Sequence, residues 1–163
     1  MTFSEELSSV AIALGSNLGD REAHLAFGLS ALPGFITHLR QSTWYDTSPV
    51  GVSLDQPRYL NGVVVGKTSL SARELLDRLL EIEAAAGRVR SAPMASRTLD
   101  LDLILFGDKK IEEPGLTVPH PRFRERLFVL EPLADVAPDW IDPVTGLSIS
   151  VLLQRARPAP GPS

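Results

Sequence analysis

Cysteine is absent from this 163-residue chain. Its absence excludes disulfide bonds and thiolate metal sites, and it fits a reducing compartment. An excess of basic residues is missing as well, because 16 Lys and Arg stand against 20 Asp and Glu and give a formal charge of −4 at pH 7. This acidic balance argues against a general binder of nucleic acids or of membrane surfaces.

Long apolar runs are missing too. No uninterrupted stretch approaches the roughly 20 residues of a membrane helix, and residues 1–7 lack the basic and then apolar pattern of a secretory signal. We therefore expect a cytoplasmic protein, and as a separate expectation we take it to be a monomer. With 44% hydrophobic residues, its length suits one globular domain. We expect this domain to span residues 8–154, with a disordered Pro/Ala/Gly-rich tail over 155–163.

The apolar pattern predicts an alternation of strands and helices. The expected strands cover residues 10–14, 36–45, 60–68 and 98–106, the expected helices cover 20–32, 71–87 and 121–133, and a hairpin surrounds Ile111 and Leu116. The order strand, helix, strand, strand, helix, strand matches the ferredoxin-like β-α-β-β-α-β unit. The fold class is therefore α+β, with a mostly antiparallel sheet, both long helices on one face and a C-terminal helix. We expect the other face to be left to loops and ligands.

The most informative stretch is Arg97-Thr-Leu-Asp-Leu-Asp-Leu-Ile-Leu-Phe106. It reads as a buried strand, yet Asp100 and Asp102 point to one face about 7 Å apart, because strand side chains alternate. Ionised carboxylates there are costly to desolvate unless a cation meets them. Two hard oxygen ligands at this separation suit Mg²⁺ that also binds substrate phosphates. Taken alone, the pair is explained equally well by an edge strand with solvated aspartates.

Three arginines precede this strand. Arg88, Arg90 and Arg97 bracket a short loop that contains a proline. Their planar, paired donors suit phosphate oxygens, and cations beside metal-binding carboxylates are what a polyphosphate substrate requires. The alternative is that they cap the preceding helix or pair with Glu81 and Glu83. That alternative explains Arg88 well and Arg97 poorly.

At this point the chain resembles a known family, the 6-hydroxymethyl-7,8-dihydropterin pyrophosphokinases of folate biosynthesis. Arg88-Val-Arg90 followed by Arg97-Thr-Leu-Asp-Leu-Asp102 carries the first part of the likeness. The remaining blocks are Ala13-Leu-Gly-Ser-Asn-Leu-Gly-Asp20, Asp55-Gln-Pro-Arg-Tyr-Leu-Asn61, and Thr117-Val-Pro-His120 with Arg126 and Phe128. They stand in family order and at family spacing, and together they are highly specific.

The resemblance implies a set of site residues. Asp100 and Asp102 would hold two Mg²⁺, and Arg97 would join them as the third catalytic residue. The implied contacts with ATP come from Glu83, Arg88, Arg90, Leu103, Thr117, His120 and Arg126. The implied contacts with the pterin come from Thr47, Ser48, Val50, Tyr59, Asn61 and Phe128, with Tyr59 and Phe128 stacking on its ring and Asn61 bonding its edge. Without the resemblance, Tyr59 and Phe128 would read as ordinary core residues.

The sequence also departs from the family pattern. The family commonly shows Trp-Gly-Pro before the arginine that matches Arg97, whereas Met94-Ala-Ser96 stands here. Closure of this loop over ATP must then rely on other groups, such as Met94. The expected reaction is transfer of the diphosphate of ATP to 6-hydroxymethyl-7,8-dihydropterin, with release of AMP. The alternative is a ferredoxin-like binding or regulatory module that keeps the site without turnover.

Overall fold

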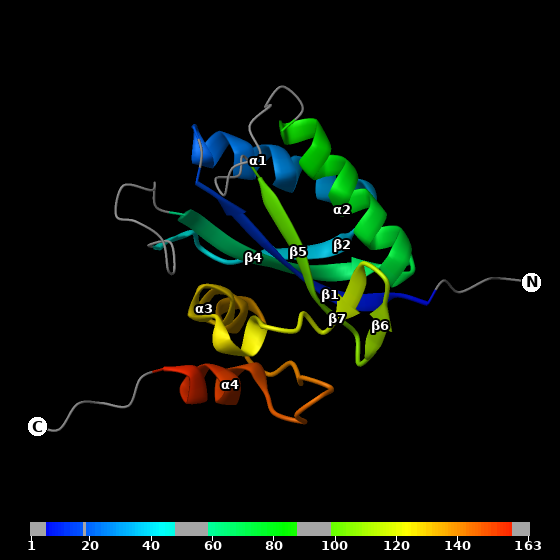
Figure 1. Ribbon diagram of the computed structural model, residues 1–163, viewed down its shortest axis with the longest axis vertical. Coiled ribbons are helices and arrows are strands. Elements are labelled where there is room, and N and C mark those ends of the chain that lie inside the picture. The colour runs from blue at the N-terminus through cyan, green and yellow to red at the C-terminus, as the bar shows by residue number, and fades with distance from the viewer. Residues whose placement is uncertain (1–5, 18, 48–58, 88–98, 158–163) are drawn as a thin grey trace, which may run out of the picture.

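A central antiparallel sheet organises the chain in this computed structural model, which describes residues 6–17, 19–47, 59–87 and 99–157 (Figure 1). The strands of the sheet run in the order β2-β4-β1-β5, and β3 also pairs with β4. Their bounds are β1 Ser8–Ser16, β2 Thr37–Gln41, β3 Tyr45–Thr47, β4 Tyr59–Thr68 and β5 Asp100–Phe106. The helices are α1 Arg21–Ala31, α2 Ala72–Gly87, α3 Leu127–Val136 and α4 Ile149–Ala156, with short 3-10 turns at Leu32–Gly34 and Phe123–Glu125. The hairpin strands β6 Ile111–Glu113 and β7 Leu116–Val118 form a separate two-stranded sheet.

Local capping signals fix where the two long helices begin. The Asp20 carboxylate accepts a hydrogen bond from the backbone N–H of Ala23 at 3.1 Å and starts α1. At α2, the Ser71 hydroxyl accepts from Glu74 N at 3.1 Å while the Glu74 carboxylate accepts from Ser71 N at 3.0 Å. Such reciprocal caps satisfy backbone donors that a helix start would otherwise leave unpaired. The two helices therefore begin within one residue of the starts expected at residues 20 and 71.

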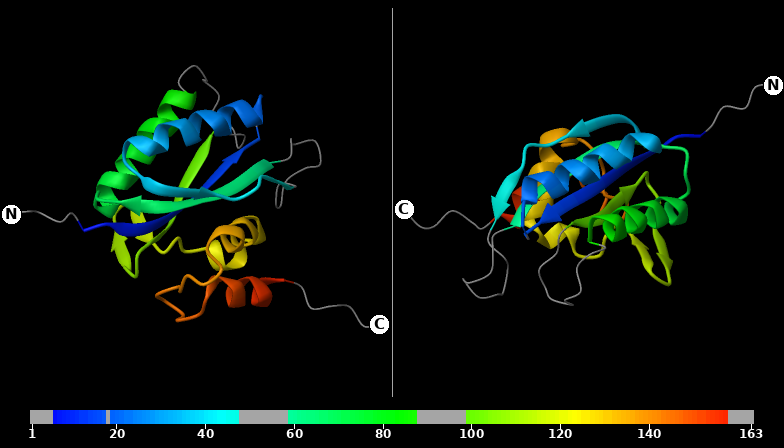
Figure 2. Two further views of the ribbon diagram at one scale, coloured as in Figure 1. Left: turned by 180° about the vertical axis from the view of Figure 1, so that it is seen from behind. Right: turned by 90° about the horizontal axis from the view of Figure 1, so that it is seen from above.

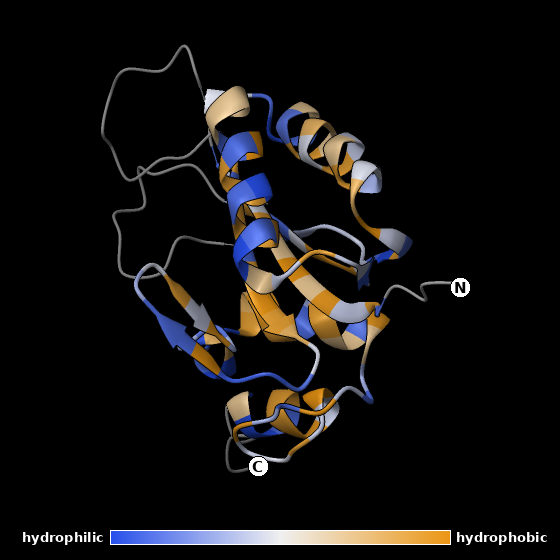
Figure 3. Ribbon diagram, turned by 90° about the vertical axis from the view of Figure 1, so that its right-hand side faces the viewer, coloured by the Kyte–Doolittle hydropathy of each residue, from blue (hydrophilic) through white to orange (hydrophobic). Residues whose placement is uncertain are grey.

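Two hydrophobic cores lie on opposite faces of the sheet, and helices cover both (Figures 1 and 2). On β1, Val10 and Ile12 pack toward α1 and α2, whereas Ala11 belongs to the core under α3 and α4. Figure 3 shows hydrophobic colour concentrated on the strands of the central sheet, while the helices carry both colours. The ferredoxin-like fold is thus confirmed. The expectation that the second face is left to loops and ligands is wrong in part, because apolar residues such as Val63 and Val65 on that face are buried under α3, and α4 packs against α3.

The expected strand over residues 36–45 is divided into β2 and β3. Ser42 interrupts it, because its backbone N–H donates to Val63 O at 2.9 Å while its hydroxyl accepts from Val63 N at 3.0 Å. Next to it, the Trp44 ring lies over Gly62, where an added Cβ would stand 2.5 Å from ring carbons. The missing side chain of Gly62 therefore lets Trp44 reach the core. One side-chain hydrogen bond and one close aromatic contact set this break.

The helices after β7 also differ from expectation. The segment expected to be helical from residue 121 first forms the 3-10 turn, and α3 begins only at Leu127 because Arg126 is extended, with φ −111° and ψ 101°. At the other end, α4 continues through Ala156, past the expected start of the tail at residue 155. Residues 158–163 of that tail lie outside the described residues. In the described ranges, no helix is long and apolar enough to cross a membrane.

A buried ion pair holds the α3–α4 segment together. The Asp142 side chain is fully buried and accepts from Arg124 Nε at 2.5 Å and Arg124 Nη2 at 2.9 Å. It also accepts from Thr145 Oγ1 at 2.8 Å and from Val144 N at 3.0 Å. Burial by itself would raise the pKa of Asp142, but the hydrogen bonds from Arg124, Thr145 and Val144 outweigh it and hold the pKa below its ordinary value. The carboxylate is therefore kept ionised inside the fold.

Candidate active site

A cavity of about 730 Å³ lies between the sheet and the segment around α3. The sheet contributes one wall, and the 3-10 turn, the start of α3 and the end of α4 contribute the other. The lining residues on the sheet are Ala13, Leu14, Gly15, Tyr45, Tyr59, Asn61, Asp100 and Asp102. Those opposite are Arg122, Glu125, Arg126, Leu127, Phe128, Val129, Glu131 and Ala156. Segments from most of the chain length thus meet at one hollow.

Strand register aligns the polar residues of the sheet wall in a row. Gly15 on β1 pairs with Asn61 on β4 and with Asp100 on β5, and Tyr45 on β3 pairs in turn with Asn61. Asn61 and Asp100 therefore stand two strand spacings apart, roughly 10 Å. Between them Gly15 has no side chain, so the floor of the cavity is open along the line that joins the amide to the carboxylate.

The acidic pair lies on the cavity face of β5, as predicted. Asp100 and Asp102 are half-buried and line the cavity, whereas Leu101 and Leu103 pack on the opposite face in the core. Their neighbours on β1 are Gly15 and Ala13, which are small enough to leave both carboxylates accessible. This placement disfavours a simple solvated edge strand, because the two carboxylates face a walled hollow.

A third carboxylate approaches this pair from α2. Glu83 Oε2 accepts a hydrogen bond from the backbone N–H of Leu101 at 2.6 Å, between the two aspartates. Burial raises the pKa of Glu83 to about 7, and the charge of Asp100 and a hydrogen bond with it add to the rise. The local field is therefore strongly negative, which favours a cation. Among the residues that the structure describes, no group of three or more His, Cys, Asp or Glu side chains is arranged to hold a metal ion.

A histidine and an arginine stand beside the acidic pair. Burial lowers the pKa of His120, followed by the positive charge of Arg126, while Asp100 opposes the shift. The imidazole is therefore neutral at pH 7. Because the backbone N–H of Arg122 donates to His120 Nδ1 at 3.2 Å, the ring proton resides on Nε2, which is then a donor. The Arg126 guanidinium lies 5.5 Å from the centre of the Phe128 ring, a separation at which the cation is attracted to the ring face.

Aromatic side chains line both walls of the cavity. Tyr59 and Asn61 are two residues apart on β4 and share a face, while Phe128 lies on the first turn of α3 opposite them. The predicted stacking and edge-bonding residues are thus brought into one cavity. Their contacts with a pterin stay predictions.

Other predicted residues fall elsewhere. Leu103 is the fourth residue of β5 and packs in the core under α1 and α2, which leaves only its backbone for a ligand. Thr117 is exposed on β7 and pairs with Glu112, outside the cavity lining. Thr47 pairs with Tyr59 through the backbone of β3. Ser48, Val50, Arg88, Arg90 and Arg97 lie outside the described residues, so their assigned contacts remain expectations.

Sequence reasoning missed several residues of the cavity. These are Tyr45, Arg122, Glu125 and Glu131. For Tyr45 a signal existed, because it is an aromatic residue two positions before the predicted site residue Thr47. For Glu131 the signal was its place one helical turn after Phe128. Arg122 and Glu125 follow an irregular turn, where no periodicity applies.

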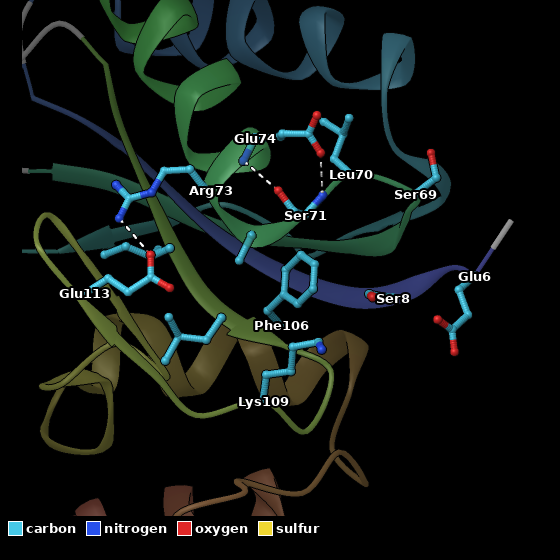
Figure 4. A pocket seen from close by; sticks show the side chains of 13 residues that line it. Glu6, Ser8, Ser69, Leu70, Ser71, Arg73, Glu74, Phe106, Lys109 and Glu113 are labelled. Atoms are coloured by element: carbon cyan, nitrogen blue, oxygen red, sulfur yellow. Dashed lines mark hydrogen bonds and ion pairs between the residues drawn. The ribbon is translucent and has the colours of Figure 1, made fainter.

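A second cavity, of about 600 Å³, lies at the opposite end of β1 (Figure 4). Its walls include the capping box of α2 and the ion pair between Arg73 Nη2 and Glu113 Oε1 at 3.0 Å. The dashed lines in Figure 4 show that Arg73 pairs with Glu113 and that Ser71 and Glu74 bond each other. None of the predicted site residues lines this cavity, so it offers positions for control substitutions.

Solved structures with the same fold define the class. The crystal structure of the Plasmodium falciparum HPPK-DHPS S436F/A437G/A613T triple mutant with STZ-DHP superimposes with a TM-score of 0.74 at 16% sequence identity. The match covers 94% of this chain and 44% of that chain, so the chain spans less than half of the matched structure. At this identity the likeness shows the fold alone: an α+β domain of the kind present in that protein.

Sequence comparison gives the family. A model of the 7,8-dihydro-6-hydroxymethylpterin-pyrophosphokinase (HPPK) family matches residues 11–138. The chain is 42% identical over 155 residues to a 2-amino-4-hydroxy-6-hydroxymethyldihydropteridine pyrophosphokinase of Synechocystis, with 94% of this chain and 78% of the relative covered. It is 47% identical over 127 residues to the Bacillus subtilis protein of the same name, with 77% and 75% covered. The chain therefore belongs to the HPPK family, and the resemblance noted in its motifs is confirmed.

Proposed function

We propose that this chain transfers the diphosphate of ATP to 6-hydroxymethyl-7,8-dihydropterin, giving the dihydropterin diphosphate and AMP in folate biosynthesis. Membership of a pyrophosphokinase family supports the reaction class. The observation that carries the assignment is the row across the sheet, in which Gly15 lies between Asn61 and Asp100. A flat ring resting on Gly15 has an amide at one end and a carboxylate at the other.

The pterin is expected in the slot between the two walls. Phe128 and Tyr59 offer ring faces for stacking, which suits a flat heterobicycle. Asn61 offers both a donor and an acceptor to the edge of the ring. With that edge at Asn61, the hydroxymethyl group at the far end of the ring points toward Asp100.

Asp100 and Asp102 fit Mg²⁺ by their chemistry. They are oxygen donors on one face of a rigid strand. Burial first, and then the charges of Asp100 and Asp102, raise the pKa of the neighbouring Glu83 to about 7. When bound there, two Mg²⁺ ions would neutralise phosphate charge and align the phosphates with the acceptor hydroxyl. The chain itself supplies the fixed carboxylates, because β5 is anchored in the core through Leu101 and Leu103.

The triphosphate is expected on the side of His120 and Arg126. The Nε2–H of a neutral His120 donates to a phosphate oxygen without adding charge, and Arg126 adds a permanent cation. Arg88, Arg90 and Arg97 would complete this cationic side, with Arg97 nearest to the transferred group. In this arrangement one neutral donor, His120, and one cation, Arg126, would meet the phosphates beside the acidic pair. Cytoplasmic location and a monomeric state stay predictions from the sequence.

Release of AMP tests the assignment directly. The purified chain, ATP, Mg²⁺ and 6-hydroxymethyl-7,8-dihydropterin should give AMP and the dihydropterin diphosphate in equal amounts. Asn61→Ala and Phe128→Ala should raise the KM for the pterin far more than the KM for ATP, and Arg73→Ala at the second cavity should change neither. Tight binding of both substrates without AMP would instead support the binding module. Equal losses for ATP and pterin in the Asn61 and Phe128 variants would show that the slot is placed wrongly.

A further inference from the structure

A hydrogen bond joins the two walls of the cavity. The Tyr45 hydroxyl on β3 donates to Asp135 Oδ2 on α3 at 2.6 Å, across 90 positions of sequence. This is the length of a hydrogen bond to an ionised carboxylate. The hydrogen bond to Asp135 raises the pKa of Tyr45 to about 12, with burial and the Asp135 charge adding to it. Tyr45 therefore remains a donor over the whole physiological range.

The elements that this bond joins carry the pterin slot. Tyr45 pairs with Asn61 through the backbone, and its side chain lines the same cavity. Asp135 lies two turns after Phe128 on α3. The bond thus ties the strand beside Asn61 to the helix that presents Phe128.

Strand β3 is also held toward α1 by an ion pair between Arg21 Nη1 and Asp46 Oδ1 at 3.5 Å. It is three residues long, lies at the edge of the sheet and pairs only with β4 among the described strands. Short edge strands with few backbone hydrogen bonds belong to the less stable parts of a fold. A side-chain tether from β3 to α3 therefore has a large share in holding this edge against the helix.

We propose that the Tyr45–Asp135 hydrogen bond sets the width of the pterin slot, which makes Tyr45 and Asp135 positioning residues for the acceptor substrate. The proposal rests on the proposed function, because it takes the cavity between Tyr59 and Phe128 as the pterin slot. A flat ring stacks on both walls only if their separation is fixed. Without the bond, some molecules adopt a wider slot that does not bind the pterin. The apparent pterin affinity is then reduced in proportion to the fraction of molecules that keep the competent arrangement.

The experiment compares variants that remove the bond with little change of shape. Tyr45→Phe deletes only the hydroxyl, Asp135→Ala deletes the acceptor, and Asp135→Asn keeps an acceptor oxygen. Because Asp135 is exposed and water competes for it, we expect the Kd of the pterin to rise roughly three- to tenfold in Tyr45→Phe and Asp135→Ala. The Kd of ATP should stay within about twofold, and Asp135→Asn should recover part of the loss. The double variant should be no worse than either single variant, because both remove the same bond.

Two controls separate the bond from the slot. Asp139→Ala removes a nearby exposed carboxylate without touching Tyr45, and it should leave the pterin Kd unchanged. Phe128→Ala tests the slot itself and should weaken the pterin strongly. An unchanged pterin Kd in Tyr45→Phe, with a strong loss in Phe128→Ala, overturns the positioning role and leaves the slot in place. Unchanged pterin binding in Phe128→Ala overturns the slot, and the positioning role with it. Equal losses for ATP and pterin, together with a lower Tm, would reduce the bond to a general structural contact.

Discussion

Replacing Gly15 with alanine adds one methyl group to the floor of the cavity. A Cβ at this position lies 3.0 Å from Asn61 Oδ1 and 3.8 Å from Tyr59 Cδ1. The second distance is an ordinary contact, but the first is too close by a few tenths of an ångström. The Asn61 amide must therefore move, and the new methyl group also occupies the plane in which we place the pterin.

The magnitude follows from what Asn61 is expected to do. An edge hydrogen bond in a desolvated site is worth about 1–1.5 kcal/mol, and Asn61 offers one or two of them. Gly15→Ala should therefore cost about 1–3 kcal/mol of pterin binding, which is roughly a five- to 150-fold rise in Kd. Folding stability should not fall, because alanine is favoured over glycine within a strand by about 0.5–1 kcal/mol.

Calorimetric titration of the pterin and of ATP, with a thermal melt, measures all three quantities. Gly34→Ala is a matched control, because nothing lies within 4 Å of a Cβ at Gly34. It should leave both affinities unchanged. If Gly15→Ala binds the pterin as tightly as the wild type while Asn61→Ala does not, the ring does not rest on β1 and the row across the sheet has another role.

Three further predictions concern the carboxylates. Asp100→Asn or Asp102→Asn should nearly abolish AMP formation without lowering Tm, since each removes repulsion near Glu83; full turnover in excess EDTA would refute the metal role. The raised pKa of Glu83, about 7, means that the folded state binds its proton more tightly than the unfolded state. The protonated Glu83 therefore adds to the free energy of unfolding below the ordinary pKa of 4.5, and this contribution is lost as pH rises through 7. Glu83→Gln should therefore flatten the fall in Tm between pH 5 and pH 8 in EDTA, and an unaltered profile would contradict this. Asp142→Ala should leave Arg124 without its partner and cost about 3–5 kcal/mol, a fall in Tm of roughly 6–20 °C. Because the pKa of Asp142 is lowered, its contribution in the wild type should be present above about pH 4 and lost below it.

Most of the fold could be predicted because its signals are local. The Asp20 cap and the capping box of Ser71 and Glu74 depend on residues three positions apart, and the structure forms both. The acidic pair is equally local, because strand alternation alone puts Asp100 and Asp102 on one face. Where a residue's conformation depends on its immediate neighbours, the sequence alone is sufficient to predict it.

The structure differs from the sequence-based expectation where a residue's conformation depends on a partner far away in the sequence. The break between β2 and β3 depends on Ser42 bonding Val63, and no rule of spacing connects them. Glu83 is an ordinary helix residue until α2 packs beside β5 and brings its carboxylate to Leu101 N. The bond from Tyr45 to Asp135 spans 90 positions. Propensity and periodicity contain no information on such tertiary contacts.

Strand β1 shows how a segment without polar side chains in the cavity still defines the site. On the face toward α1 and α2 it presents the large residues Val10, Ile12 and Leu14, which fill that core. On the cavity face, Ala13 and Gly15 present almost nothing. Because β1 lies between β4 and β5, this lack of volume lets one ligand reach Asn61 and Asp100 at once. The residues of β1 thus alternate in size as well, with large side chains on the core face and small ones on the cavity face. Larger residues on the cavity face would keep the fold and separate the acceptor from the metal carboxylates.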